Sequence, residues 1–298
     1  MKSHQRGDTA EHVRRRVEHD TADIGEVSLH YVTAGPEDGD PIVLLHGFPE
    51  FWYGWRHQIP ALADAGYRVI TPDQRGYNRS DKPDGLDAYT VDRLAGDITG
   101  LLDALGYERA CMAGHDWGAG VLWQTMLRYP DRVTRGVIMN VPHPAVFEEF
   151  LLGRPRQLLK SYYMFVYQLP RLSELLLSAD GWRGLRWFMD TSNRADTFSD
   201  EALRQYRDAW SEPRALTAML NWYRALFRRD IAAPPSMEVT VPTMVVWGMQ
   251  DAYLVPEMAE ASAAYCQNSR VEQFDHATHW VQHEASERVN QILCRFFD

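Results

Sequence analysis

The chain has 298 residues, of which 45% are hydrophobic, so it can bury a full core as one large domain or as a domain with an insertion. The formal net charge of -10 repels a phosphate backbone, and no basic run is longer than Arg14–Arg16, so we expect no nucleic-acid partner. No stretch of about 18 apolar residues could span a bilayer, and the N-terminal residues contain no apolar leader segment. We therefore expect a cytoplasmic protein without a membrane partner.

The first third of the chain alternates strands with helices. Residues 26–35 alternate apolar and polar side chains, which predicts a half-exposed strand, and the apolar runs 41–46 and 67–72 predict buried strands. A helix is expected over residues 51–65, and Thr90 is expected to cap another helix that ends near residue 105. This alternation indicates an α/β fold in which helices flank a mostly parallel sheet.

A glycine-flanked carboxylate comes next. Residues Cys111–Gly120 read CMAGHDWGAG, in which an apolar run passes directly into a helical pattern at Asp116. In the related G-x-S-x-G turn, the nucleophile elbow, the glycines permit a sharp bend that places one side chain beside the N–H groups of a helix start. On this pentapeptide alone, a glycine-rich turn with an Asp helix cap, as in a dinucleotide-binding loop, is an equal alternative.

A carboxylate at an elbow restricts the chemistry. Serine that attacks a saturated carbon forms an ether, which water cannot cleave in the same site, whereas aspartate forms an alkyl ester that can be hydrolysed. Asp116 therefore indicates displacement at a saturated carbon. The sequence His46-Gly47-Phe48-Pro49 follows a predicted strand, and we expect the backbone N–H groups of Phe48 and Trp117 to form an oxyanion hole.

The pattern changes after a further strand predicted at residues 133–140. Residues 144–233 have helical periodicity without a convincing strand, which predicts an all-helical cap that excludes water from the site. Residues 1–143 and 234–298 are expected to form the two parts of the core. The helical stretches predicted in the cap are residues 147–152, 158–169, 172–177, 199–210 and 215–228.

Two polar residues follow the last predicted strands, which are residues 243–248 and 270–274, before a terminal helix near the C-terminus. Asp251 and His279 would both lie at the carboxyl edge of the sheet, where ligand sites of such folds form. We expect His279 to activate water and Asp251 to orient its ring. The alternatives are that Asp251 caps the helix near residue 256, or that the base is His276 or His283.

Nearly the whole chain resembles the epoxide hydrolases of the α/β-hydrolase fold. The matching stretches are HGFP, PDQRGYNRSDKP, GHDWG, NVPHP, SYYMFVYQLP, LNWYRAL, WGMQDAYLVP and HATHW. The resemblance implies that Asp116 attacks an epoxide carbon while Tyr163 and Tyr223 donate hydrogen bonds to the ring oxygen. A tyrosine hydroxyl, with a pKa of about 10, is suited to protonate the strongly basic alkoxide. The implied partners are a small hydrophobic epoxide and water.

Aromatic side chains around these residues complete the expected site. The expected substrate contacts are Phe48, Trp117, Tyr167 and Trp222. Tyr162 and Tyr167 are alternatives to Tyr163, because they are adjacent to it or one helical turn away. No cofactor is implied, and no metal is expected, since Cys111, Cys266 and Cys294 lack the spacing of metal ligands.

Thr278 departs from the resemblance, because a glycine usually precedes the histidine, and Asn78-Arg79 stands where a second glycine is usual. The alternative function is a haloalkane or haloacid dehalogenase, which shares the aspartate, and Trp117 could donate to a halide. However, haloalkane enzymes typically have asparagine at the position of Phe48 and lack the tyrosine pair, and fluoroacetate enzymes have arginine in place of Trp117. A non-catalytic ligand-binding protein is the third alternative. The particular epoxide and the oligomeric state do not follow from the sequence.

Overall fold

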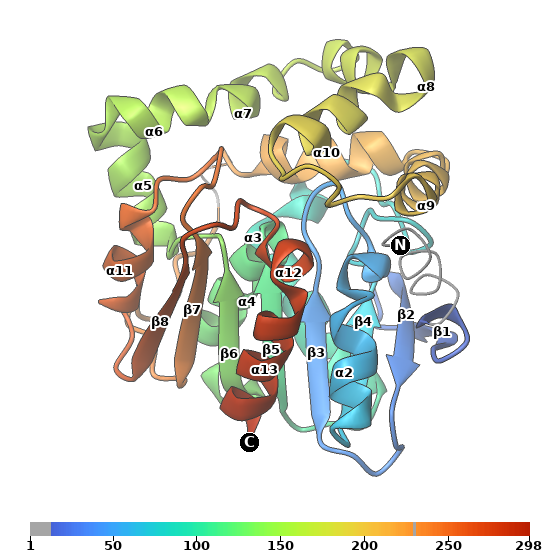
Figure 1. Ribbon diagram of the computed structural model, residues 1–298. Helices are drawn as coiled ribbons and strands as arrows, with labels where there is room; N and C mark the ends of the chain where they lie inside the picture. The colour runs from blue at the N-terminus through green and yellow to red at the C-terminus, as the bar shows by residue number, and fades with distance from the viewer. Residues whose placement is uncertain (1–12, 229–230) are drawn as a thin grey trace.

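The computed structural model describes residues 13–228 and 231–298. Within these residues eight strands form one sheet, in the order β1-β2-β4-β3-β5-β6-β7-β8 (Figure 1). The pairs β1–β2 and β2–β4 are antiparallel, and every other neighbouring pair is parallel. The strands are β1 (Glu18–Asp23), β2 (Ser28–Ala34), β3 (Pro41–Leu45), β4 (Arg68–Pro72), β5 (Ala110–His115), β6 (Val133–Met139), β7 (Thr243–Gly248) and β8 (Ser269–Phe274).

Helices cover both faces of this sheet. In front of it in Figure 1, α2 (Gln58–Asp64) packs with α13 (Ser286–Phe297). Behind it, α3 (Val91–Ala104) packs with α4 (Trp117–Arg128). The shorter core helices are η1 (Trp52–Trp55), η2 (Asp87–Tyr89), η3 (Pro130–Arg132), α11 (Glu257–Ala263) and α12 (Val281–Glu284). The predicted fold class, a mostly parallel sheet flanked by helices, is confirmed.

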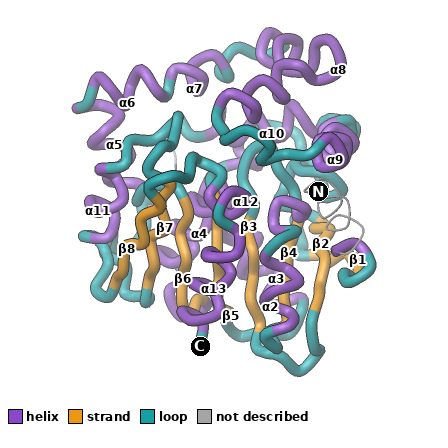
Figure 2. The backbone as a smooth tube through the Cα atoms, in the orientation of Figure 1, coloured by secondary structure: helices purple, strands orange, loops and turns teal. Residues whose placement is uncertain are grey.

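The described chain between β6 and β7 contains helices and loops, and we call helices α5 to α10 the cap. They are α5 (Pro144–Gly153), α6 (Pro155–Lys160), α7 (Tyr162–Val166), α8 (Leu172–Thr191), α9 (Asp200–Trp210) and α10 (Ala215–Ala225). The cap lies over the end of the sheet at which the parallel strands finish (Figure 2). Residues 229–230 of the predicted cap, 144–233, lie outside the described residues.

One local prediction in the core is wrong, and a second is confirmed only in part. The expected helix over residues 51–65 is a 3-10 turn, η1, followed by α2. Pro60 explains the break, because it has no N–H for the carbonyl of residue 56 and its ring would collide with that carbonyl. Thr90 is at the N-cap of α3, but its hydroxyl donates to the carbonyl of Asp87 instead of accepting a helix N–H.

The predicted cap helices also differ from those observed. The helix expected over residues 158–169 is divided at Ser161 into α6 and α7. The helix expected over 172–177 extends to Thr191 as α8, with non-helical backbone angles over Ala179–Trp182. Gly181 in that interruption has a φ of +68°, a conformation that glycine adopts without steric cost.

Candidate active site

Asp116 lies at the junction of β5 and α4, at the bend predicted for a nucleophile elbow. Its φ is +51°, in the left-handed region that costs energy for a side chain with Cβ. The flanking glycines make this bend sterically possible. A Cβ added to Gly114 would lie 2.5 Å from the carbonyl oxygen of Gly118, and one added to Gly118 would lie 2.1 Å from that of Leu45. The elbow thus holds the Asp116 carboxylate at the carboxyl edge of the sheet.

The loop after β3 brings a backbone donor to this carboxylate. The N–H of Phe48 donates to Asp116 Oδ1 over 2.7 Å. Gly47 allows the approach, since a Cβ there would lie 2.3 Å from the Cβ of Asp116. Trp117 is the first residue of α4, so its N–H has no acceptor within the helix. Both residues of the predicted oxyanion hole therefore lie beside Asp116.

The loops after β7 and β8 bring Asp251 and His279 together. His279 Nδ1 lies 2.8 Å from Asp251 Oδ2, and His279 Nε2 lies 3.4 Å from Asp116 Oδ2. All three residues predicted to act in sequence thus form one continuous group. Asp251 does not cap α11, whose N-cap is Pro256, because its Oδ1 accepts the N–H groups of Tyr253 and Leu254, which precede that helix. The alternative base His283 instead contacts Glu50, with 2.8 Å between His283 Nε2 and Glu50 Oε1, and His276 is exposed.

The charges of this group shift its pKa values. Burial alone would lower the pKa of His279, but the carboxylates of Asp251 and Asp116 together outweigh it and raise that pKa to about 10. Burial would raise the pKa of Asp251, yet His279 and further hydrogen-bond donors hold it below its ordinary value. In the free protein His279 therefore carries a proton between two carboxylates at neutral pH.

Asn140 is a functional residue that the sequence reasoning did not single out. It follows β6, and its Nδ2 donates to Asp251 Oδ2 over 2.7 Å while its Oδ1 accepts the N–H of Gly248 over 2.9 Å. Asp251 Oδ1 also accepts the N–H groups of Tyr253 and Leu254. The signal that could have identified Asn140 is the one used for Asp251, a polar residue directly after a predicted parallel strand.

Glu50 was missed for a different reason, since nothing in the local pattern marks a buried carboxylate in a loop. It accepts hydrogen bonds from Tyr206 and Gln282 as well as contacting His283. His115 Nδ1 lies 3.6 Å from Glu50, and the other ring nitrogen of His115 is 2.7 Å from the carbonyl oxygen of His279. Glu50 thus anchors the segment beneath His279.

Tyr163 on α7 and Tyr223 on α10 face each other across the cap side of the site. Their ring centroids are 6.0 Å apart, and the Tyr223 ring lies 5.1 Å from that of Trp117. Burial, followed by the negative charge of Asp116, raises the pKa of both hydroxyls well above the ordinary value of 10. Among the described residues neither hydroxyl has a hydrogen-bond partner, so both can donate to a ligand.

The neighbouring aromatic residues are not equivalent. Tyr162 is 56% exposed, whereas Tyr167 is buried with its ring 5.5 Å from that of Tyr163 and 5.0 Å from that of Tyr223. Phe48 contacts Tyr223, with 5.3 Å between ring centroids. Trp222 packs against Trp117, and its indole N–H donates to the carbonyl of Arg75 over 3.0 Å. Trp222 can therefore supply an apolar ring surface, but its N–H is already engaged.

The two departures from the family pattern have structural explanations. The N–H and hydroxyl of Thr278 both donate to the carboxylate of Glu284, over 2.7 and 2.9 Å. This pair holds the loop that carries His279. Asn78 adopts a φ of +41°, and its amide donates to Asp73 Oδ2 over 2.8 Å, so the side chain stabilises a conformation for which glycine is usual.

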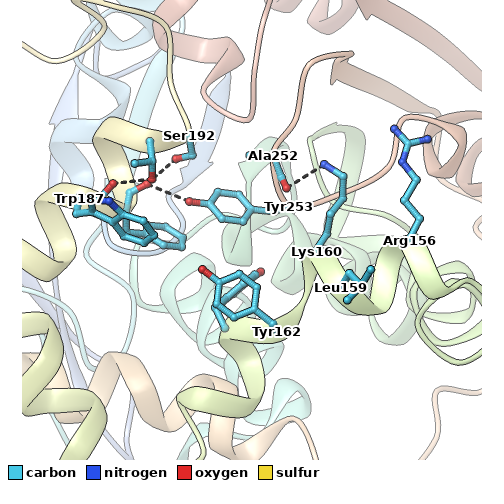
Figure 3. A pocket seen from close by; sticks show the side chains of 11 residues that line it. Arg156, Leu159, Lys160, Tyr162, Trp187, Ser192, Ala252 and Tyr253 are labelled. Atoms are coloured by element: carbon cyan, nitrogen blue, oxygen red, sulfur yellow. Dashed lines mark hydrogen bonds between the residues drawn. The ribbon is translucent and has the colours of Figure 1, made fainter.

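A cavity of about 640 Å³ lies between the cap and the loop after β7 (Figure 3). Tyr163 and Tyr253 line it, and the Tyr253 ring is 5.3 Å from that of His279. Figure 3 shows Trp187 and Ser192 at one end of the cavity and Lys160 with Arg156 at the other. The cavity therefore extends from the outer surface of the cap to the tyrosine that faces Asp116.

Across residues 13–228 and 231–298, no group of three or more His, Cys, Asp or Glu side chains could hold a metal ion. Within the same ranges, no helix is long and apolar enough to cross a membrane.

Comparison with known proteins agrees with this geometry. Residues 40–286 match the family model described as the alpha/beta hydrolase fold. The chain is 45% identical to the AB hydrolase superfamily protein YfhM of Bacillus subtilis, over 91% of this chain and 94% of that protein. It is 36% identical to Epoxide hydrolase 4 of Mus musculus, over 90% of this chain and 76% of that protein. It also resembles the crystal structure of Bacillus megaterium epoxide hydrolase in complex with an inhibitor, with a TM-score of 0.85, 31% identity, and coverage of 94% of this chain and 99% of that one.

Proposed function

The chain belongs to the epoxide hydrolases of the α/β-hydrolase fold family, and from this premise we propose that it converts a hydrophobic epoxide to a vicinal diol through an alkyl ester on Asp116. One observation carries the proposal. A carboxylate in an elbow lies 3.4 Å from a histidine, and its charge raises the pKa of two tyrosine hydroxyls that have no partner among the described residues.

Ring opening uses the two oxygens of Asp116 differently. Oδ1 accepts the N–H of Phe48, so Oδ2 is the oxygen available to attack an epoxide carbon. As the carbon–oxygen bond of the ring breaks, the ring oxygen gains negative charge. Tyr163 and Tyr223 donate hydrogen bonds to that oxygen, and a proton from one of them produces the second hydroxyl group of the diol.

Hydrolysis of the ester then requires a neutral His279. Ester formation removes the negative charge of Asp116, which is one of the charges that raise the pKa of His279, so the ring gives up its proton more readily, and this proton restores the tyrosine hydroxyl that protonated the ring oxygen. Nε2 of His279 then takes a proton from water, and the resulting hydroxide attacks the ester carbon. The N–H groups of Phe48 and Trp117 stabilise the oxyanion that forms. Asp251 keeps the Nδ1 proton of the ring in place.

The dehalogenase alternative has less support. A departing halide needs donors, and Trp117 has an indole N–H that could serve. The second nearby indole, that of Trp222, donates to the carbonyl of Arg75. The paired tyrosine hydroxyls, in contrast, match the need of an alkoxide for protonation, which a halide does not have.

The test uses styrene oxide in water enriched in heavy oxygen, at one turnover per protein molecule. The diol should contain the light oxygen of Asp116, and the heavy label should appear in the peptide that carries Asp116. Asp116→Asn should form no diol above the spontaneous rate while unfolding at the same temperature as the natural chain. Heavy label in the first-turnover diol would instead mean that water attacks the epoxide directly.

Further parts of the proposal concern the cap and the location of the protein. We propose residues 144–233 as a cap domain whose aromatic residues, with Phe48 and Trp117, contact the apolar part of the epoxide. The aromatic lining of the site supports a hydrophobic substrate. The cytoplasmic location expected from the sequence stays a prediction.

A further inference from the structure

The outer surface of the cap is unusually apolar. Of the twelve exposed large hydrophobic side chains among the described residues, ten lie between residues 152 and 187. They are Leu152, Leu158, Leu159, Tyr162, Phe165, Leu169, Leu172, Leu175, Leu176 and Trp187. Helices α6, α7 and α8, which carry most of them, run along the upper edge of the molecule in Figure 1. We call this set the cap patch. Apolar surfaces of this extent on a folded protein mark interaction sites.

Helix α6 and the first turn of α8 each bury a polar residue and expose leucines. On α6 Gln157 is fully buried, while Leu158 and Leu159 are 45% and 75% exposed. At the start of α8 Ser173 is buried, and its hydroxyl donates to the carbonyls of Val166 and Leu169. Leu175, two residues further, is 65% exposed. Because the buried polar groups are satisfied by hydrogen bonds, this arrangement is part of the fold, and the exposed leucines are free to contact something else.

The charge of this segment is opposite to that of the whole chain. Residues 151–177 contain four cations and one acid, whereas the chain has a net charge of -10. The acid, Glu174, is bound by Arg224 through two hydrogen bonds of 2.9 and 3.0 Å. Arg154 and Arg171 have no ion pair among the described residues, and Arg156 has only an exposed contact of 3.5 Å with Glu257. The cap patch is therefore apolar with a positive fringe.

We propose that the cap patch rests on the surface of a lipid bilayer that contains anionic headgroups. Leucine and aromatic side chains would enter the interface while Arg154, Arg156 and Arg171 contact the headgroups. A second copy of the chain fits less well, because a two-fold interface would place this positive surface against the same positive surface of the other copy. The expectation of no membrane partner rested on the lack of a spanning segment, and surface contact needs none.

The position of the cavity gives this contact a use. Leu159, Tyr162 and Trp187 belong to the cap patch and also line the cavity that reaches Tyr163 (Figure 3). An apolar epoxide dissolved in the bilayer could thus enter the site without crossing water. This last step rests on the proposed function, whereas binding to the bilayer does not, so the two are tested separately.

The experiment is flotation of the full chain with vesicles of phosphatidylcholine alone or mixed with phosphatidylserine. We expect binding to the mixed vesicles that weakens as salt is added. Arg154→Gln with Arg171→Gln should reduce this binding about 25-fold, on the order of fivefold per charge. Leu158→Ser with Leu175→Ser and Leu176→Ser should reduce it about 10-fold or more at every salt concentration. Tyr129→Ser, an exposed aromatic residue of the core, is the matched control and should bind as the natural chain does.

Circular dichroism and the unfolding temperature of each variant show whether it has folded. If the folded natural chain does not bind the mixed vesicles at low salt, the proposal is wrong. It is also wrong if the leucine variants bind normally. Sedimentation velocity tests whether the cap patch binds a second copy of the chain instead. If the natural chain is a dimer and the leucine substitutions make it a monomer, the cap patch is a dimer interface and the bilayer proposal is wrong.

Discussion

The core and the cap contribute to the site in opposite ways. In the core, Asp251 accepts hydrogen bonds from Asn140, from two backbone N–H groups and from His279, so its charge is fully compensated before any substrate arrives. In the cap, the hydroxyls of Tyr163 and Tyr223 have no partner within the described residues. The core side is therefore preorganised for ester hydrolysis, whereas the cap side completes its hydrogen bonds when an epoxide binds.

The largest effect is expected from a substitution that removes only the function of the core, ester hydrolysis. His279→Gln should still open the epoxide, because Asp116 and both tyrosines remain, but the ester should not be hydrolysed. Turnover should fall by about a thousandfold or more. Mass spectrometry of the intact protein should show the added mass of one substrate. If the protein stays unmodified after long incubation, His279 is not the residue that activates water.

The next largest effect is expected from substitutions that remove only the hydrogen-bond donors of the cap. Tyr163→Phe or Tyr223→Phe leaves the pocket shape nearly unchanged but removes one donor to the alkoxide, so ester formation should slow by about 10- to 1000-fold. The double variant should be nearly inactive on epoxides. Stopped-flow measurement of the first turnover separates this step from hydrolysis. Tyr162→Phe is the matched control, because its side chain is exposed.

The same tyrosine variants are also assayed for release of bromide from alkyl bromides, which distinguishes an epoxide hydrolase from a dehalogenase. A halide leaves without a proton, so this activity should change little. Epoxide opening at the natural rate together with slower bromide release would replace the epoxide hydrolase proposal with the dehalogenase one.

A smaller effect concerns the contact between cap and core. Gln157 on α6 donates to the carbonyl of Tyr253 over 2.9 Å and accepts the N–H of Val255 over 3.1 Å, next to Asp251. Gln157→Leu should cost about 1–3 kcal/mol of unfolding free energy, because buried backbone groups lose their partners. It should slow ester hydrolysis more than ester formation. Urea denaturation and single-turnover kinetics test this, and Leu158→Ala on the same helix should change neither.

The last effect is a pH dependence of stability, and it leaves the chemistry of both sides of the site unchanged. The folded-state pKa of His279, about 10, is above its ordinary value of 6.5. Its contribution to stability is therefore complete below pH 6.5 and is lost as the pH rises toward 10. The natural chain should lose more unfolding free energy across this range than His279→Gln does. Urea titrations at the two ends measure the difference, and equal losses would contradict the assigned ion pairs.

The predictable parts of the molecule share a cause. Buried parallel strands such as β3 and β7 are continuous apolar runs, and the glycines around Asp116 are required by contacts under 3 Å, so both leave a signal in the local sequence. The polar residues that follow parallel strands could be predicted to lie near one another, because parallel strands all end at the same edge of the sheet. Asp116, Asp251 and His279 are close together for that reason.

The parts that were missed depend on distant contacts. β1 has the sequence EHDTAD, with one buried residue, and forms only because its backbone pairs with β2 at the edge of the sheet. The exposed leucines and the buried polar residues of α6 and of the first turn of α8 oppose the usual rule that leucine is buried and glutamine or serine exposed. The buried role of Glu50 depends on Tyr206, which is 156 residues away. No local pattern contains this information.

The hydrogen bonds of Asn140 have a consequence for how new substrate specificities can arise. Asn140 directly follows β6, the last strand before the insertion, and it binds both Gly248 at the end of β7 and Asp251 in the loop after β7. If the segment between β6 and β7 is replaced by another, these hydrogen bonds of Asn140 can still form. A lineage, or a protein engineer, could therefore replace the cap with one of another length and composition while retaining the nucleophile, the acid and the histidine.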